Sequence, residues 1–299
     1  MKRSARLKLG VKRSLVSLLA RYNSRNGVLG VEIRSTVGLG AKLEWCLEIM
    51  AYCNDNGLLP QFRFSYPDAQ PPMDYFGSLF RIRDSQERRA RFVTISSIIE
   101  LDLGKDYDQV LTIGLANYLI NKYLVVKEDV VSEVDDFCRQ QFGDRRVVGV
   151  HYRGTDKVRE SPIVAYESVR RNIDHYLELY PTTDRIFVAT DDANFLDHLQ
   201  NASLGRTIVC RDDSFRSRDG SSIHESSFTD KYEINRDALV NCLILSRCEA
   251  LLKTASILSG WSKLFNPRLP VVMLNKPHDE HLWFPERVLV VENLFEPIK

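Results

Sequence analysis

The segment VVGVHYRGTDK, Val147 to Lys157, gives the clearest indication of the fold. Its first half is an apolar run rich in β-branched residues, which is typical of a buried strand. Its second half places His, Arg, Thr, Asp and Lys where that strand ends. In open α/β sheets, ligands bind outside the carboxyl ends of the strands. The segment therefore predicts a strand that leads into a binding or catalytic loop, with a solvated turn as the alternative.

The rest of the second half alternates between strand-like and helical patterns. Further strand-like runs cover residues 185–190, 206–210, 250–254 and 270–274. The helical stretch 238–247 is apolar nearly all round, which predicts a buried helix. Strands and helices in alternation predict a parallel sheet covered on both faces.

The first half has a similar but looser pattern. Strands are predicted at 28–34 and 60–66, with the glycine turn VGLG at Val37–Gly40 and a helix at 41–56 between them. Two more helical stretches cover 109–125 and 128–141, and the polar residues 143–146 follow. We therefore predict an α/β protein of two Rossmann-like domains facing a cleft, residues 1–145 and 146–299.

Composition excludes several classes of protein. The 299 residues carry 41 basic and 40 acidic side chains, without the basic excess typical of a nucleic-acid-binding protein. No run approaches the roughly 18 apolar residues of a membrane span. The six cysteines form no CxxC pair and are predicted to be mostly reduced core thiols, although their even number leaves a secreted protein as an alternative. A Rossmann dehydrogenase is excluded because Leu43 occupies the third glycine position after Gly38 and Gly40.

The basic N-terminus, residues 1–23, lacks the continuous apolar region of a signal peptide. It predicts either a solvated first helix that packs on the body or an amphipathic helix that contacts an anionic membrane surface. We therefore expect a cytoplasmic location, with peripheral contact at the inner membrane surface as the second interpretation.

Polar residues follow three of the predicted strands. Arg153 and Lys157 can face an anion, and Gly154 leaves room for close approach of the backbone. Asp191 and Asp192 end the strand at 185–190, where Asp192 alternatively caps the next helix. The third strand end, at 250–254, opens into the hydroxyl residues of a helix start, which suits phosphate. Ser256 and Ser259 are either ligands there or simple helix caps.

The order HYRGTDKV, FVATDD and ALVNCLILSRCEALLKTASILSGW is similar to the three motifs of fucosyltransferases. The resemblance is to the α1,6 and nodulation enzymes, with the α1,2 and protein O-fucosyltransferases as a looser superfamily. It covers Val147 to about Phe265, and the VGLG turn resembles the family's glycine loop. The resemblance implies a GT-B fold, a GDP-fucose donor, inversion at the anomeric carbon and no metal or other cofactor.

Residue roles follow from the same resemblance. It implies that Arg153 holds the β-phosphate and stabilises the departing GDP. The residues that it implies around the donor are Gly38, Gly40, His151, Asp156, Lys157, Asp191, Asp192, Lys253 and Ser256. It also implies that the second domain binds the nucleotide sugar and that the first lies on the acceptor side.

The sequence departs from the family pattern at two positions. Asn241 stands where the family has a guanine-recognising Asp, and Asp237, one helical turn earlier, is the alternative. Ile257 stands at the second hydroxyl of the third motif, unless Ser259 replaces it. The catalytic base has two candidates: Glu160 by position in the α1,6 enzymes, and Asp156, a weaker base beside Arg153 and Lys157.

The sequence therefore predicts an inverting, metal-independent glycosyltransferase, a fucosyltransferase that uses GDP-fucose and a glycan or glycolipid acceptor. Two alternatives stay open: the same fold with another nucleotide sugar, and a family member that binds nucleotide or sugar without turnover.

Overall fold

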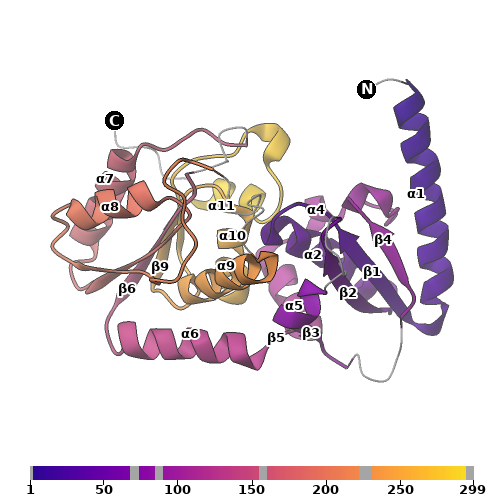
Figure 1. The fold of residues 1–299 in the computed structure, drawn as a ribbon, viewed down its shortest axis with the longest axis horizontal. Coiled ribbons are helices and arrows are strands. Elements are labelled where there is room, and N and C mark those ends of the chain that lie inside the picture. The colour runs from indigo at the N-terminus through magenta and orange to yellow at the C-terminus, as the bar shows by residue number, and fades with distance from the viewer. Residues whose placement is uncertain (1–2, 68–73, 85–89, 155–159, 222–229, 294–299) are drawn as a thin grey trace. The chain divides into compact units, whose positions relative to one another are not determined.

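The computed structural model describes residues 3–67, 74–84, 90–154, 160–221 and 230–293. The chain divides into two compact units, Met1–Glu128 and Asp129–Lys299. Each unit contains its own parallel sheet with helices packed against it (Figure 1).

The first unit is built on a parallel sheet of order β2-β1-β4. Five of the seven residues of β1 are buried, with α1 packed against β1 and β4 and α2 packed against β2. A short antiparallel pair, β3-β5, lies outside this sheet. The elements are α1 (Arg3–Asn23), η1 (Ser24–Asn26), β1 (Val28–Arg34), α2 (Leu39–Asp55), β2 (Leu59–Ser65), α3 (Tyr75–Leu79), β3 (Phe80–Ile82), β4 (Phe92–Ile95), η3 (Ile98–Glu100), α4 (Tyr107–Val110), α5 (Ile113–Tyr123) and β5 (Leu124–Val126).

The second unit is built on a parallel sheet of order β10-β9-β6-β7-β8. Its elements are α6 (Glu128–Gln141), β6 (Val147–Tyr152), α7 (Tyr166–Leu179), β7 (Arg185–Thr190), α8 (Ala193–Asn201), β8 (Thr207–Val209), α9 (Lys231–Leu245), β9 (Ala250–Lys253), α10 (Ile257–Phe265), β10 (Val271–Met273), η6 (Asp279–His281) and α11 (Glu286–Asn293).

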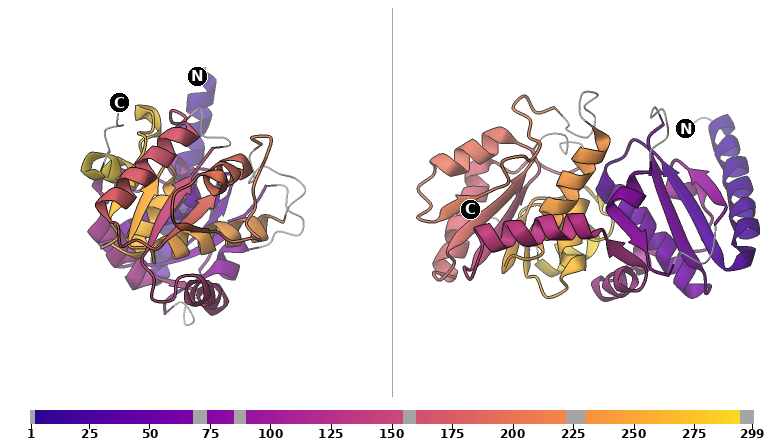
Figure 2. Two further views of the ribbon diagram at one scale, coloured as in Figure 1. Left: turned by 90° about the vertical axis from the view of Figure 1, so that its left-hand side faces the viewer. Right: turned by 60° about the horizontal axis from the view of Figure 1, so that its bottom comes forward.

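The strand order makes β6 the centre of the second sheet. The chain runs outward from β6 through β7 to β8, and then returns to the other side of β6 for β9 and β10. The segments that leave β6 and β9 therefore diverge at a topological switch point, which is where doubly wound sheets bind ligands. α7 and α8 cover one face of this sheet, and α9 and α10 lie on the other side, as Figure 2 shows. The predicted α/β class is confirmed.

Strand boundaries agree closely with the sequence-based expectation in the second unit. β6 and β7 have the predicted limits, and β8, β9 and β10 are shorter than predicted by one or two residues. In the first unit, β4 was not predicted, and the helix expected at 109–125 is divided into α4, α5 and the strand β5. The predicted buried helix at 238–247 is the C-terminal part of α9, whose apolar residues are buried.

The unit boundary lies earlier in the chain than the sequence-based boundary at 145/146. The difference is α6, which belongs to the second unit. Its Phe137 ring lies 5.5 Å from the Phe187 ring of β7, and its Glu133 accepts from Arg211 at 2.6 Å. The polar residues 143–146 are thus a turn from α6 into β6.

All six cysteines are free thiols, as predicted, and four of them are buried. Burial raises the pKa of Cys242 to about 12, so this thiol is protonated at neutral pH. Within the described ranges, no helix is both long and apolar enough to cross a membrane.

Candidate active site at the carboxyl edge of the second sheet

Arg153 connects three strand ends of the second unit. It follows β6, and its Nε lies 3.2 Å from Oδ2 of Asp191, the residue that follows β7. Its backbone N–H donates to Oγ1 of Thr254, which follows β9, at 2.9 Å. Arg153 and Asp191 retain 22% and 12% of their side-chain exposure, so solvent reaches this ion pair. The structure thus brings together the three polar strand ends that the sequence predicted to share one edge.

Asp191 orients the segment after β6 with both carboxylate oxygens. Oδ2 faces the Arg153 guanidinium, and Oδ1 accepts the Gly154 N–H at 3.2 Å. A charge-assisted contact and a backbone contact from one carboxylate restrict both the side chain and the main chain. The backbone carbonyl of Asp191 also accepts from Ser217 N at 2.8 Å, which secures Asp191 to the loop after β8.

Asp192 has a structural role in this arrangement. Its Oδ1 accepts the N–H groups of Asn194 at 2.9 Å and Phe195 at 3.3 Å, which makes Asp192 the N-cap of α8. Its Oδ2 accepts the Tyr166 hydroxyl at 2.5 Å. Asp192 is only 7% exposed. The helix-cap interpretation of Asp192 is confirmed, and burial together with this carboxylate raises the pKa of Tyr166.

The space between Asp192 and Tyr152 is too small for any residue other than glycine at position 154. A Cβ atom at this position would lie 2.6 Å from Asp192 Oδ2 and 2.5 Å from Cε1 of Tyr152. Any side chain would therefore displace the cap of α8 or the buried ring of Tyr152. The glycine allows the segment after β6 to pass close above β7, which places Arg153 next to Asp191.

Thr254 belongs to the site and was missed among the sequence-based candidates. Besides accepting from Arg153, it donates its N–H to the His151 carbonyl at 3.0 Å. The signal for it was its position directly after a buried strand. The next residue, Ala255, donates its N–H to Asn275 Oδ1 at 2.7 Å, which fixes the path toward α10.

The two serines of the third motif differ in their surroundings. Ser256 is the N-cap residue of α10, and no cap hydrogen bond from its side chain is found in the described part of the chain. Ser259 is 1% exposed, and its hydroxyl donates to the Ser256 carbonyl at 3.1 Å. The hydroxyl of Ser259 thus points into the helix, whereas the N-terminus of α10 begins at Ser256 beside the Arg153 contact.

Lys253 has a different environment from the one that the sequence suggested. Its side chain is fully buried in an ion pair with Glu286 of α11, and its Nζ also contacts Met273 Sδ at 3.7 Å. Successive side chains of a strand point to opposite faces. In-register partners of neighbouring parallel strands share a face, so Lys253 lies on the face of His151, where it meets Glu286 of α11. The neighbouring strand residue His151 is half-buried and pairs in register with Lys253 and with Ala189.

Asp237 and Asn241 lie together in a polar cluster on α9. Asn241 Nδ2 donates to Asp237 Oδ1 at 2.9 Å and to Ser214 Oγ at 3.0 Å. Asp237 also accepts from Arg211 at 2.6 Å and from the Phe215 N–H at 3.2 Å. Burial raises the pKa of Asp237, and Arg211 opposes this shift. A carboxylate at position 241 would face Asp237 directly, so the amide of Asn241 avoids a repulsion between like charges.

Glu160, Asp156 and Lys157 are the remaining residues of the predicted site in the second unit. Glu160 is half-buried in a turn, and its backbone carbonyl accepts from His278 N at 2.8 Å. Asp156 and Lys157 lie outside the described residues.

Gly38 and Gly40 lie in the first unit, at the start of α2. Gly38 is the N-cap residue, with extended backbone angles and no atom within 4 Å of an added Cβ. Lys42, two residues after Gly40, is 1% exposed and lies 3.8 Å from the centre of the Tyr66 ring. Its Nζ has no hydrogen-bond partner in the described structure, and burial lowers its pKa to about 7.

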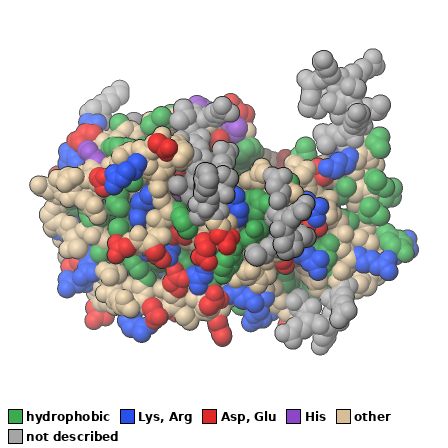
Figure 3. Space-filling model, viewed as in Figure 1, with side chains coloured by type: hydrophobic (Ala, Val, Ile, Leu, Met, Phe, Trp, Pro, Cys, Tyr) green, Lys and Arg blue, Asp and Glu red, His purple; other side chains and the backbone are tan. Residues whose placement is uncertain are grey.

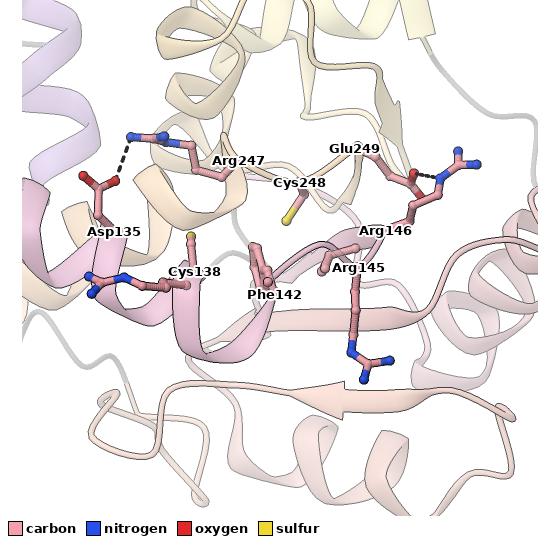
Figure 4. Close-up of a pocket in the computed structure, with 11 residues that line it drawn as sticks. Asp135, Cys138, Phe142, Arg145, Arg146, Arg247, Cys248 and Glu249 are labelled. Carbon is pink, nitrogen blue, oxygen red and sulfur yellow. Dashed lines mark hydrogen bonds and ion pairs between the residues drawn. The ribbon is translucent and has the colours of Figure 1, made fainter.

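A separate hollow of about 570 Å³ lies at the amino ends of β6 and β9 (Figure 4). Two ion pairs lie at this hollow, Arg247 with Asp135 at 3.1 Å and Arg146 with Glu249 at 2.7 Å. Burial raises the pKa of Cys138, which lines the hollow, to about 11. This edge is opposite to the one that carries Arg153, and two further arginines, Arg139 and Arg145, line the hollow.

Among the described residues, no group of three or more His, Cys, Asp or Glu side chains is arranged to hold a metal ion.

Several solved structures of similar fold are fucosyltransferases. A crystal structure of the fucosyltransferase NodZ from Bradyrhizobium has a TM-score of 0.54 at 14% identity, over 85% of this chain and 96% of that chain. A NodZ alpha-1,6-fucosyltransferase soaked with GDP-fucose gives 0.53 at 14% identity, over 82% and 94%. The same enzyme co-crystallised with GDP gives 0.53 at 15% identity, over 82% and 93%. The likeness shows the fold, and the predicted GT-B class is confirmed.

The sequence itself matches a family model. No curated protein sequence matches the chain. The model of nodulation protein Z (NodZ) matches residues 116–286, which is more than half of the 299 residues and includes β6, β7 and β9 with the strand ends described above. The predicted resemblance to fucosyltransferases of the nodulation type is thereby confirmed. The chain belongs to the nodulation protein Z (NodZ) family.

Proposed function

We propose that the chain is a fucosyltransferase that transfers fucose from GDP-fucose to a hydroxyl of a glycan or glycolipid acceptor. One observation carries the proposal: Arg153 lies at the switch point of the second sheet, where Asp191 orients it and solvent reaches it. Membership of the NodZ family and the likeness to NodZ enzymes crystallised with GDP-fucose or GDP support the choice of donor.

The proposed reaction proceeds in one displacement with inversion. The bond between the anomeric carbon and the β-phosphate oxygen breaks, and its electron pair stays on the phosphate. The acceptor oxygen bonds to the anomeric carbon, and the acceptor proton passes to a carboxylate. Arg153 faces the charge that develops on the leaving diphosphate, and a fixed cation at such a position lowers the barrier. Because Arg153 supplies this charge, we propose that the reaction requires no metal ion or other cofactor.

Glu160 is our candidate for the base, with Asp156 as the alternative. A catalytic base must come within hydrogen-bonding reach of the acceptor hydroxyl, and its pKa must not lie far below the working pH. Asp156 lies three residues after Arg153, and a carboxylate beside a guanidinium is held in its charged form, which weakens it as a base. Glu160 is farther along the chain, in the turn that His278 N secures.

The donor-binding residues are proposed on the same edge. We propose that the donor phosphates contact Arg153, His151, Lys157 and the N-terminus of α10 at Ser256. We assign the guanine ring of the donor to Asn241 with Asp237. Asn241 offers a different hydrogen-bonding pattern from a carboxylate, which keeps another nucleotide sugar as the alternative donor. Gly38 and Gly40 begin α2 in the first unit, which we assign to the acceptor side.

We also propose a cytoplasmic location with peripheral contact at the inner membrane surface through the basic N-terminus, which suits a glycolipid acceptor. The balanced charge of the chain gives no basis for a nucleic-acid partner.

Thermal unfolding with a panel of GDP, UDP, CDP, ADP and CMP tests the donor. A ligand that binds only the folded state adds about 2.7 kcal/mol at a hundred times its dissociation constant. We expect a rise in Tm with GDP, with or without EDTA, and a smaller rise for Arg153→Ala. A rise in Tm with a different nucleotide and not with GDP would indicate a donor other than GDP-fucose.

Release of GDP from GDP-fucose then separates an enzyme from a binding protein. An active enzyme leaks fucose to water even when the acceptor is unknown. Stabilisation by GDP without any release, in the presence of a panel of glycan and glycolipid acceptors, would favour the non-catalytic alternative.

A further inference from the structure

α1 has two apolar faces, only one of which is buried. The inward face places Val16 and Ala20 against the first unit, each with 8% exposure. The outward face carries five large apolar side chains with 46–64% exposure, Val11, Leu15, Leu18, Leu19 and Tyr22. We call these five residues the α1 ridge. Figure 3 shows hydrophobic side chains along the part of the surface formed by α1, with Lys and Arg side chains beside them.

The spacing of the α1 ridge is that of a single helical stripe. Val11, Leu15, Leu18 and Tyr22 follow one another at steps of four, three and four residues, which places them one above the other on a helix. A monomeric protein seldom exposes so many adjacent large apolar side chains without a partner. The ridge therefore indicates a surface that is covered in use.

α1 is held to the first unit so that the ridge stays outward. Lys12 pairs with Glu100 at 2.6 Å, and Arg13 pairs with Asp102 at 3.1 Å. The Ser17 hydroxyl accepts the Asp102 N–H at 2.8 Å. These contacts come from the side of the helix that carries Val16 and Ala20, so they fix its rotation about its own axis.

The charge on α1 is of one sign only. The helix sequence, Arg3–Asn23, contains several Lys and Arg residues and no Asp or Glu. Arg21 is exposed beside the ridge, and the Arg25 guanidinium lies 4.8 Å from the centre of the Tyr22 ring. Cations that flank an apolar stripe are the pattern of a helix that lies in the interface of an anionic membrane.

We propose that the α1 ridge docks on an anionic lipid surface, with the apolar side chains among the acyl chains and Arg21 and Arg25 at the phosphate headgroups. Docking of two α1 ridges from two copies of the chain would bring helices of the same charge together without any acidic residue on either helix to compensate. The helix lies on the membrane and does not cross it. The inference deepens the peripheral contact proposed above and does not depend on which donor the enzyme uses.

Flotation of the full chain with vesicles tests the docking surface. The probes are vesicles of phosphatidylcholine alone and vesicles with one third phosphatidylglycerol, at low salt and at high salt. We expect binding to the anionic vesicles that weakens with salt. The variant Leu15→Ser/Leu18→Ser should reduce this binding about tenfold or more, because each removes a large apolar side chain from the interface. Leu179→Ser, at a residue with 60% exposure on α7, is the matched control and should bind as the parent does.

A second measurement tests whether the α1 ridge itself enters the membrane. Trp fluorescence of Leu18→Trp should shift to the blue with anionic vesicles, whereas Leu179→Trp should not shift. Both variants and the double serine variant should keep the parent's release of GDP from GDP-fucose in vesicle-free buffer, so failure of membrane docking and failure of the transfer reaction are measured separately. Equal binding of the parent and the double serine variant would overturn the proposal. The proposal would also be overturned if the parent binds neither kind of vesicle, is dimeric in solution and becomes monomeric on the double substitution.

Discussion

Asp191 Oδ2 lies 3.2 Å from Arg153 Nε, and the other oxygen of the same carboxylate accepts the N–H of the residue after Arg153. One carboxylate therefore fixes both the guanidinium and the backbone that carries it. A preorganised cation stabilises a developing charge without reorganising during the reaction, which is the property that a leaving diphosphate requires.

Arg153→Ala should reduce turnover by more than about 100-fold, because the loss of one such charge-stabilising group costs on the order of 3 kcal/mol of barrier. The free energy of unfolding should change by no more than about 1 kcal/mol, since Arg153 is partly exposed. Steady-state release of GDP and denaturant unfolding measure the two effects. Arg153→Lys retains the positive charge but not the bidentate N–H donors of the guanidinium, and should recover only part of the lost turnover. Near-normal turnover of Arg153→Ala would contradict the central role.

Asp191→Asn should lower turnover by about tenfold, because the amide still accepts from Gly154 but no longer attracts the guanidinium. Asp191 acts through Arg153 and is thus a positioning residue. The double variant Arg153→Ala/Asp191→Asn should be no slower than Arg153→Ala alone. Multiplied losses in the double variant would show instead that Asp191 acts directly on the substrate.

Gly154→Ala should destabilise the fold by on the order of 2 kcal/mol, because the new methyl group would meet Asp192 Oδ2 and the Tyr152 ring. Gly38→Ala is the matched control: its φ of −65° suits alanine, and no atom lies within 4 Å. Gly38→Ala should leave stability within ~0.5 kcal/mol and lower only the affinity for a ligand that approaches the start of α2. Equal stability of the two variants would contradict the crowding at Gly154.

Glu160→Gln should reduce transfer by ~100-fold or more while GDP still raises Tm, because the amide cannot accept the proton of the acceptor hydroxyl. The comparison requires transfer to an acceptor and GDP binding to be measured on the same preparation. Retained transfer would pass the role of base to Asp156 or to the acceptor itself, and Asp156→Asn would then separate those two.

Lys42 should make stability depend on pH above neutrality. Burial lowers the pKa of its ammonium to about 7 from an ordinary value of 10.5, so the unfolded chain binds the proton more tightly. The free energy of unfolding gains a contribution from Lys42 as pH rises from 7 to 10.5 and loses it as pH falls. Lys42→Met should therefore stabilise the fold by on the order of 2 kcal/mol at pH 6, and the gain should vanish near pH 10.

Glu48, on the same helix, supplies a control of opposite sign. Burial raises the pKa of its carboxyl to about 8 from 4.5, so its contribution to stability is lost as pH rises through that range. Glu48→Gln should stabilise at pH 9 and have little effect at pH 5. Parallel pH profiles for the two variants would show that neither residue titrates as its burial indicates.

Local pattern was sufficient for much of the second unit. Val147–Tyr152 and Arg185–Thr190 could be assigned as strands because buried parallel strands are apolar along their whole length, and that signal survives without tertiary information. The first unit was less predictable. β4 and β5 are only four and three residues long, too short for a periodic signal to distinguish a strand from a helix.

The sequence by itself determined the class of the fold, the strands that lead to polar residues, and the motifs that placed Arg153 in the candidate site. It could not determine which polar residues face the ligand edge. Asp192 caps a helix, Lys253 is buried with Glu286, and Thr254 binds the backbone of Arg153. These differences depend on which face of a strand a side chain occupies and on which distant element meets it there. Only the packing of β6, β7, β9 and α11 decides both.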